Sequence, residues 1–495
     1  VRDRFQRSRE ELLEEETEEL RAKVAAMPEY MDVNLQVKSV MLELLSLMYF
    51  SGMIRFTGVA KAFVCMFTVV KELYRNLSGR VEVLAQRLIF DGRRMNLFWR
   101  PPPKMQPVSA SQFSYLDASS TTRRGRRLVG FQGDVPCFYY TLLLPFWMNP
   151  WFCIAGIKAK ELVDHLRHHH GVEVPLEDGM EFVCVAVVLM GWSWGCWVGQ
   201  TVLEDLMVRV PNLRAEWRLM YGGPLPVFLE QLGQVLHFQY IDDFGGWMML
   251  LVGPDGQVDL ALARKVLRLC VRVLRKFGFG CHKMVLGFKL EPLGVVVEDR
   301  GEEVVTEISD RKFGVLDQGG RHLIRRGRCS GKDMERTLGH FVNAFLLVRQ
   351  ALSILHSCYE FMKRHRGGTK EVPLWRSVLA ELWVAVSILP LIRSVISRDW
   401  WLGAYLSGAS TYGGAVLQSI AKLREVRREA AWAELKGWFV KPGRPKVGSV
   451  RLSLRDTLLS GDGSVGADSD AALAEMAFTD GALGAPLLGW RPSSR

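Results

Sequence analysis

The sequence predicts an α/β (α+β) fold, and two observations support this. The chain has 495 residues, of which 48% are hydrophobic and 24% charged, values typical of globular proteins with buried cores. Short strand-like runs also alternate with stretches of helical periodicity. The strand-like runs are residues 67–70, 86–90 and 293–297, and the helical stretches are residues 260–277, 332–363 and 373–397.

The two ends of the chain differ in composition from the middle. Residues 3–26 are dense in charge, which predicts a solvated helix. A new unit starts near residue 399, and after residue 441 the chain is rich in Gly, Ser, Asp and Ala, which predicts disorder. The sequence begins at Val1 without an initiator Met or a signal peptide, so we expect a fragment or an incomplete gene product.

Charge and cysteine usage limit the class of protein. The formal net charge of +11 is compatible with a polyanionic partner. The nine cysteines are scattered and form no CxxC pair, which indicates a reducing, intracellular setting and leaves nucleus or cytoplasm open. Residues 135–157 and 182–203 carry no formal charge and are long enough for membrane helices. Prolines, glycines and polar residues interrupt them, so we favour buried elements of an α/β core over a membrane protein.

Two adjacent acids, Asp242 and Asp243, lie between an apolar run and a glycine pair. A tight turn after Ile241 would place both carboxylates at the tip of a hairpin, and Asp134 would begin a second strand. Three carboxylates on two neighbouring strands can hold two divalent cations, a pair that catalyses phosphate transfer. The alternative is an ordinary turn, in which Asp and Gly are common.

Lys71, Arg87 and Arg93 are candidates for contacts with phosphate, with a solvated face as the alternative for Lys71, and Lys283 is a candidate proton donor. Arg87 and Arg93 could bind phosphate oxygens through bidentate guanidinium groups, or they could lie on a solvated face. Lys283 follows a glycine-rich turn and could protonate a leaving group, or it could be a surface lysine.

Other residues near these acids also have two readings. Phe138 or Tyr139 could stack under a bound sugar, or both could simply pack in the core. Gly191 could let the backbone approach a base pair at a helix start capped by Ser193, or it could be a glycine contact inside the core. Residues 161–170 predict a short helix that ends in a run of three histidines; we expect an exposed loop there and no metal site.

Six motifs in order resemble those of a reverse transcriptase of the retrotransposon kind. They lie at residues 87–96, 134–139, 189–200, 240–243, 277–283 and 293–294. The resemblance covers about residues 50–400. It implies that Arg87 binds the incoming triphosphate and that Asp134, Asp242 and Asp243 bind metal. It also implies that the motif ending at Gln200 supports the template and the nucleotide.

The resemblance implies a right-hand polymerase with fingers, an antiparallel-sheet palm and a helical thumb. The expected units are a charged N-terminal helical extension (1–50), fingers (51–133), palm (134–310), thumb and connection helices (311–398), a ribonuclease H-like remnant (399–440) and a disordered tail (441–495). The implied substrates are an RNA or DNA template-primer and deoxynucleoside triphosphates. The implied cofactor is a pair of Mg²⁺ ions, with Mn²⁺ as the alternative.

The unit from residue 399 resembles the start of a ribonuclease H domain. Gly408 stands where that family has a metal-binding aspartate, and glycine has no side chain to bind an ion. We therefore expect no ribonuclease H activity. The rival to an active polymerase is a decayed copy that binds nucleic acid without extending a primer.

Overall fold

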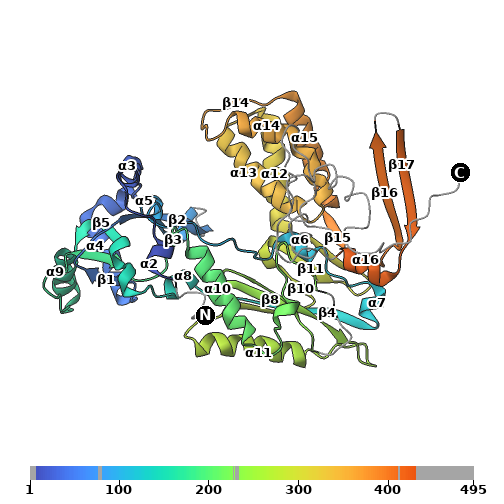
Figure 1. The fold of residues 1–495 in the computed structure, drawn as a ribbon, viewed down its shortest axis with the longest axis horizontal. Helices are drawn as coiled ribbons and strands as arrows, with labels where there is room; N and C mark the ends of the chain where they lie inside the picture. The colour runs from blue at the N-terminus through green and yellow to red at the C-terminus, as the bar shows by residue number, and fades with distance from the viewer. Residues whose placement is uncertain (1–6, 76–80, 227, 229–232, 411–412, 431–495) are drawn as a thin grey trace, which may run out of the picture.

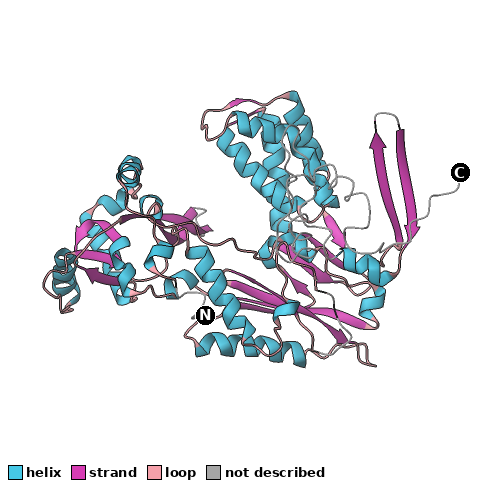
Figure 2. Cartoon of the chain, viewed as in Figure 1, coloured by secondary structure: helices cyan, strands magenta, loops and turns pink. Residues whose placement is uncertain are grey.

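The computed structural model describes residues 7–75, 81–226, 228, 233–410 and 413–430. Strands and helices form a mixed α/β fold, which confirms the predicted fold class. Figure 1 shows an N-terminal lobe around β1, β5, α4 and α9, a central sheet that contains β4 and β8, and a helical lobe of α12–α15. Figure 2 shows strands in the N-terminal lobe, in the centre and in the hairpin at the right, whereas the helical lobe is mostly helix.

The N-terminal lobe is built on a five-stranded sheet of order β1-β6-β5-β2-β3. Its strands are β1 (Ile54–Thr57), β2 (Phe63–Arg75), β3 (Val81–Asp91), β5 (Cys153–Lys158) and β6 (Phe182–Val185). Helix α4 (Lys38–Phe50) contacts α9 (Ala159–His170) and β1. Met41, Leu45 and Met48 of α4 are buried in the hydrophobic core that includes this lobe.

We call the central four-stranded sheet the carboxylate sheet; its order is β7-β8-β4-β9 and all its pairs are antiparallel. Its strands are β4 (Arg126–Asp134), β7 (Leu236–Tyr240), β8 (Asp243–Leu251) and β9 (His282–Gly287). Alternate side chains enter two different cores, as period-2 geometry requires. Phe244 and Met248 pack with α10 (Gly195–Val208) and α11 (Ala261–Lys276), whereas Trp247 and Met249 pack toward the helical lobe.

The expected boundary between fingers and palm at Asp134 does not follow the sheets. Strand β4 ends at Asp134 and belongs to the carboxylate sheet, while residues 153–185 return to the N-terminal lobe as β5 and β6. The prediction that Asp134 begins a strand is therefore wrong. Pro136 has no backbone N–H to donate to a ladder, and Cys137 is left-handed (φ 52°), so the strand ends before the short helix α8 (Phe138–Thr141).

The helical lobe rests on a small antiparallel sheet of order β10-β11-β12-β15. The strands are β10 (Lys289–Leu290), β11 (Val295–Asp299), β12 (Val304–Ile308) and β15 (Arg393–Val395). The helices are α12 (Asp310–Arg326), α13 (Gly331–Phe345), α14 (His356–Arg364) and α15 (Arg376–Ser387). The buried side chains of this lobe are continuous with the second face of the carboxylate sheet.

The prediction of single long helices at 332–363 and 373–397 is wrong. The first is divided by the 3₁₀ segment η5 (Arg349–Leu355) between α13 and α14. The second ends at Ser387, because Pro390 follows in η6 (Leu389–Leu391) and residues 393–395 then pair with β12 as β15. Pairing at the sheet edge outweighs the helical periodicity there.

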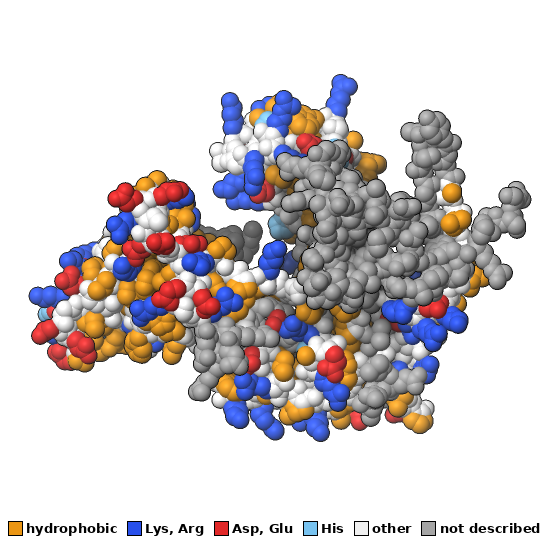
Figure 3. All heavy atoms as spheres, viewed as in Figure 1, with side chains coloured by type: hydrophobic (Ala, Val, Ile, Leu, Met, Phe, Trp, Pro, Cys, Tyr) orange, Lys and Arg blue, Asp and Glu red, His pale blue; other side chains and the backbone are white. Residues whose placement is uncertain are grey.

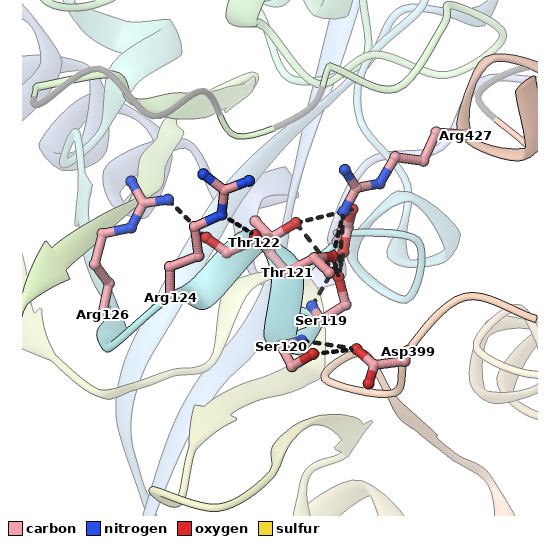
Figure 4. Close-up of polar contacts among 9 residues, drawn as sticks. Ser119, Ser120, Thr121, Thr122, Arg124, Arg126, Asp399 and Arg427 are labelled. Carbon is pink, nitrogen blue, oxygen red and sulfur yellow. Dashed lines mark hydrogen bonds and ion pairs between the residues drawn. The ribbon is translucent and has the colours of Figure 1, made fainter. Parts of the chain in front are cut away.

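Residues 399–430 form the hairpin β16 (Gly403–Ser410) and β17 (Gly413–Ile420), followed by α16 (Leu423–Ala430). Figure 4 shows Arg427 of α16 reaching Ser119, Thr121 and Thr122, which belong to the segment before β4. Arg427 also forms an ion pair with buried Asp117 at 2.7 Å. This unit is thus tied to the base of the carboxylate sheet; the predicted disordered tail lies outside the described residues.

Shorter elements complete the described chain. The charged start forms two short helices, α2 and α3, and not one helix across residues 3–26. No helix among the described residues is both long and apolar enough to span a bilayer. The short elements are α2 (Arg9–Leu12), α3 (Glu18–Ala26), η1 (Val33–Gln36), α5 (Arg93–Asn96), α6 (Ala110–Phe113), α7 (Ser120–Arg123), η2 (Phe146–Trp151), η3 (Ala215–Trp217), η4 (Pro292–Gly294), β13 (Arg328–Cys329) and β14 (Val372–Pro373).

Candidate active site

The three aspartates lie together at one end of the carboxylate sheet. Asp134, the last residue of β4, is directly opposite Asp243, the first residue of β8. Asp242 occupies the turn between β7 and β8, and its carbonyl accepts a 3.0 Å hydrogen bond from the backbone N–H of Val135. Because opposed residues of an antiparallel pair share a face, Asp134 and Asp243 point to the same side of the sheet. The sequence correctly predicted the tight turn but not this register.

The turn that carries Asp242 has a strained backbone, and a side chain from a neighbouring helix stabilises it. Tyr240 pairs with Asp243, so Ile241 and Asp242 form a two-residue loop, and Ile241 has φ 57°, a conformation that β-branched residues rarely adopt. Gln200 of α10, almost fully buried, stabilises it. The Gln200 Oε1 atom accepts from the Ile241 N–H at 2.8 Å, and its Nε2 donates to the Gln239 carbonyl at 3.0 Å. Gln200, predicted to support the nucleotide, therefore contacts the hairpin itself.

Helix α10 packs against the turn at Gly199, where an added Cβ would make ordinary van der Waals contacts. A side chain there would meet Ile241, Phe138 and Tyr139, each within 3.6 Å of the added carbon. Phe138 is buried and packs edge-on against Phe279, and the Tyr139 hydroxyl donates to Cys196 Sγ at 3.3 Å. Burial raises the pKa of Tyr139, with smaller contributions from Cys196 and the nearby charge of Asp242. In this structure both aromatic rings are buried and pack in the core beside α10.

Burial and neighbouring negative charge disfavour the charged forms of Asp242 and Asp243. Burial raises the pKa of Asp242, and the negative charge of Asp134 raises it further. Burial, then Asp242, then Asp134 raise the pKa of Asp243 to about 7. Carboxylate oxygens are the preferred ligands of Mg²⁺, and a dication offsets both burial and mutual repulsion. The donor set thus fits divalent cations.

The side chains do not converge on one point. The ligand oxygens of the three aspartates are not all within 4.8 Å of one another. Among the described residues, a different group of side chains in the N-terminal lobe meets that distance. A pair of ions about 4 Å apart spans a wider set of oxygens than a single ion does. The three aspartates thus line one end of the sheet without forming a single three-ligand site.

A β-bulge brings Lys283 to the carboxylates. The register of β4 and β9 shifts between Gln132 and Asp134, which leaves an extra residue on β9. Lys283 lies in this bulge with φ 49°, and its Nζ donates to Asp134 Oδ2 at 3.0 Å. That hydrogen bond raises the pKa of Lys283, so its ammonium stays protonated. The sequence predicted the lysine but gave no signal for the bulge.

His282 was not among the predicted residues, yet it also contacts Asp134. Its Nε2 lies 3.5 Å from Asp134 Oδ2, and its Nδ1 lies 3.2 Å from the Asp134 carbonyl. Its place beside the lysine of the 277–283 motif was the available signal. Asp134 therefore has two basic neighbours from β9.

Arg87 is exposed on β3 and faces the site from the N-terminal lobe. Its positive charge lowers the pKa values of both Asp242 and Tyr140, although other effects prevail at each. No hydrogen bond or ion pair joins its side chain to another described residue, so its guanidinium can accept a ligand. Of the two arginines predicted to contact phosphate, Arg87 is the one whose charge acts on an aspartate of the site, Asp242.

Arg93 and Gly191 lie at the joint between β3 and the loop before α10. Arg93 forms a bidentate pair with Asp91 at 2.7 and 2.8 Å, which uses the guanidinium within the lobe. Gly191 has φ 123°, and a side chain there would come 2.0 Å from the Phe90 carbonyl oxygen. The structure therefore uses Gly191 for a close contact with β3.

The predicted cap at Ser193 is wrong, because α10 begins at Gly195 after Trp194. The backbone N–H of Ser193 donates instead to Asn96 Oδ1 at 2.8 Å, and Asn96 Nδ2 donates to the Gly191 carbonyl. The asparagine thus bridges the loop to α5, an interaction that sequence spacing could not reveal.

Comparison with known proteins gave matches among solved structures alone. No family model and no curated protein sequence matches the chain. Two solved structures of foamy viral protease-reverse transcriptase with double-stranded DNA align with this chain at 12% identity. The structure of the dRH form has a TM-score of 0.47, and the alignment covers 80% of this chain and 55% of that chain. The other has a TM-score of 0.46, and the alignment covers 80% of this chain and 65% of that chain. The same protein with an RNA/DNA hybrid aligns at TM-score 0.45 and 12% identity, covering 80% of this chain and 42% of that one. The chain thus spans between two fifths and two thirds of the length of these foamy viral chains.

Proposed function

We propose that the chain is an RNA-directed DNA polymerase of a retroelement, which transfers nucleotides from deoxynucleoside triphosphates to a primer 3′-hydroxyl. The observation that carries the proposal is the set of three acids at the end of the carboxylate sheet, with Asp134 opposite Asp243, Asp242 in the turn, and Lys283 on Asp134. Surface acids in a simple turn would not need buried support from Gln200 or a bulged lysine.

Asp134, Asp242 and Asp243 would hold two Mg²⁺ ions, or Mn²⁺. When bound, such ions lower the pKa of an attacking hydroxyl and stabilise charge on a transferred phosphoryl group. The aspartates supply the negative charge that positions them, and Gln200 keeps Asp242 in place through the backbone of the turn. The raised pKa of Asp243 predicts that cation binding releases a proton near neutral pH.

Basic residues on either side of the acids would handle the triphosphate. Arg87 would bind phosphate oxygens from β3, since its guanidinium lies near Asp242 without a partner among the described side chains. Lys283 holds a proton on Nζ beside Asp134, the proton that a departing pyrophosphate must receive. Tyr139 would contact the nucleotide sugar through its ring edge, with Phe138 behind it.

A template-primer would lie between the N-terminal lobe and the helical lobe. Figure 3 shows an open hollow between them, with Lys and Arg side chains on the helical lobe beside it. Exposed basic side chains of this lobe include Arg311, Arg321, Arg325, Lys332, Arg336 and Lys363. Lysine and arginine neutralise phosphates and so give affinity that falls with salt.

We further propose that the chain lacks ribonuclease H activity. Gly408 pairs with Ala415 in the β16–β17 hairpin and has no side chain to bind a cation. An assay of RNA degradation in an RNA/DNA hybrid tests this directly; cleavage that survives in the Asp242→Asn variant would contradict it.

The decisive experiment is primer extension on poly(rA)·oligo(dT) with Mg²⁺. We expect the parent chain to extend the primer and Asp242→Asn to reduce extension at least about 1,000-fold, because the turn loses a metal ligand. Exposed Asp178→Asn is the matched control and should extend normally. Circular dichroism of each variant shows whether the fold persists.

The results separate the two candidate functions. Normal extension by Asp242→Asn would refute the metal-site assignment. A parent chain that binds the template-primer in a salt-dependent manner but never extends it would support a decayed, nucleic-acid-binding copy instead.

A further inference from the structure

A second cluster of potential metal ligands lies in the N-terminal lobe, on the helices α4 and α9. Glu43 is on α4, and His165 and His170 are on α9. One ligand atom from each lies within 4.8 Å of the others. Figure 1 shows α9 at the far side of this lobe from the carboxylate sheet, so the cluster is separate from the three aspartates.

Local sequence explains why these residues meet. Leu162, Val163 and Leu166 bury one face of α9, and this fixes the rotation of the helix. The expectation of an exposed histidine loop is wrong, because α9 stays helical through His170 and ends at the left-handed Gly171. The helix therefore places two histidines of the run beside His165, with ring centroids 4.4 Å away for His169 and 5.7 Å for His170, and His170 also reaches Glu43.

The distances match those of a tetrahedral site. His165 Nε2 and His170 Nε2 each lie 3.4 Å from the same oxygen, Glu43 Oε2. Two ligands that are both about 2.1 Å from a tetrahedral Zn²⁺ ion are about 3.4 Å apart. Two nitrogens and one carboxylate oxygen are also a common ligand set for zinc.

Burial supports the same reading. The Nε2 atom of His170 is buried and makes no hydrogen bond, because its 3.4 Å contact with Glu43 Oε2 is an ion-pair distance without hydrogen-bond geometry. The side chain of His165 is 11% exposed, and the ring of Phe50 packs edge-on against His170 at 5.3 Å. A metal ion would satisfy the orphaned nitrogen and would hold both rings in the positions seen.

An ion pair is the competing explanation. Histidines in the last turn of a helix interact favourably with its dipole when protonated, and Glu43 could serve simply as their counterion. Two charged imidazoles on one carboxylate would repel each other, however, and the His165 and His170 rings are only 5.7 Å apart. Neutral imidazoles on a cation avoid that repulsion.

We propose that Glu43, His165 and His170 bind one divalent transition-metal cation of the Zn²⁺ class. The fourth position is left to water or to a ligand from outside. The ion joins α4 to α9, which the ion pair of Lys38 with Glu161 also links. It thereby fixes the two helices that cover the N-terminal sheet, and this holds whether or not the chain is a polymerase.

The test is calorimetric titration of Zn²⁺ into the metal-stripped full chain, with Co²⁺ absorption as the second measurement. Glu43→Gln, His165→Gln and His170→Gln should each lose one bound equivalent or weaken it at least about tenfold. His168→Gln is the matched control, because exposed His168 lies on the same helix and contacts the Asp164 carbonyl instead. Co²⁺ in the parent chain should give the visible absorption of a four-coordinate site.

Comparing the number of Zn²⁺ equivalents that the parent chain and each variant bind separates this site from zinc bound elsewhere. Equal stoichiometry and affinity in the parent chain and His170→Gln would overturn the proposal. So would an equal loss in His168→Gln. Glu43 is more than half exposed, so Glu43→Gln keeps the fold and remains informative if a histidine variant misfolds.

Discussion

Replacing Asp243 with asparagine should stabilise the protein when metal is absent. Burial and the charges of Asp242 and Asp134 raise the pKa of Asp243 from 3.8 to about 7. A native state that holds its proton more tightly than the unfolded chain loses stability as pH rises through this window. At about 1.4 kcal/mol per pH unit the full penalty is about 4 kcal/mol. Asp243 is only half-buried, so screening by solvent reduces this to about 2 kcal/mol.

Urea unfolding in chelator-containing buffer measures the effect. At about pH 8 we expect Asp243→Asn to unfold with a free energy about 2 kcal/mol larger than that of the parent chain. The difference should shrink as pH falls from 7 toward 4, because the parent carboxyl then takes up its proton. Saturating Mg²⁺ should also shrink it, since the cation binds the native parent site better than the variant.

One control variant and two contradicting results test the predicted stabilisation by Asp243→Asn. Asp178→Asn removes an exposed carboxylate and should change stability by less than about 0.5 kcal/mol. If Asp243→Asn is no more stable than the parent chain at about pH 8 without metal, the three acids do not repel one another as described. A difference that stays constant with pH would refute the same reasoning.

Three further predictions concern residues around the site. His237 is fully buried, and burial lowers its pKa from 6.5 to about 4. The free energy of unfolding should therefore fall by about 3 kcal/mol as pH drops from 6.5 to 4. Urea unfolding of His237→Gln should not show this loss. Gln200→Met leaves the Ile241 N–H and Gln239 carbonyl without partners and should cost about 2–4 kcal/mol in urea unfolding, with weaker Mg²⁺-dependent extension; unchanged stability would contradict the support assigned to Gln200. Gly191→Ala should cost at least about 3 kcal/mol, whereas Gly256→Ala, at positive φ with open space around it, should cost about 1 kcal/mol; equal thermal shifts would show that contact with Phe90 is unimportant.

Much of the fold could be predicted where one local pattern dominates. The helix at 260–277 is confirmed as α11, because its apolar stripe recurs at helical spacing and is buried. The Asp242–Asp243 turn could be predicted because two acids interrupt an apolar strand pair. By contrast, Asp134 was assigned to the start of a strand, since the aromatic run after it has high strand propensity. Tertiary packing of α8 outweighs that propensity.

The candidate site was harder to predict, because its geometry depends on long-range register. The sequence contains Asp134, Asp243 and Lys283, but nothing local indicates that the first two are opposed or that a bulge turns the lysine toward them. The role of Gln200 was also not predictable, because its amide bonds to the backbone of residues 239 and 241 across the contact between α10 and the hairpin. Such contacts depend on the packed fold and leave no periodic trace in sequence.

Backbone strain connects these unpredicted features to the proposed chemistry. Among the described residues, five non-glycine residues have positive φ, and three of them, Cys137, Ile241 and Lys283, lie within three residues of an aspartate or contact one. Each such conformation costs about 1–2 kcal/mol and persists where the surrounding structure imposes it. Here Gln200 imposes it on Ile241, and the β4–β9 register imposes it on Lys283. The chain thus accepts strain where it holds three carboxylates and an ammonium together, an arrangement that folding alone would disfavour.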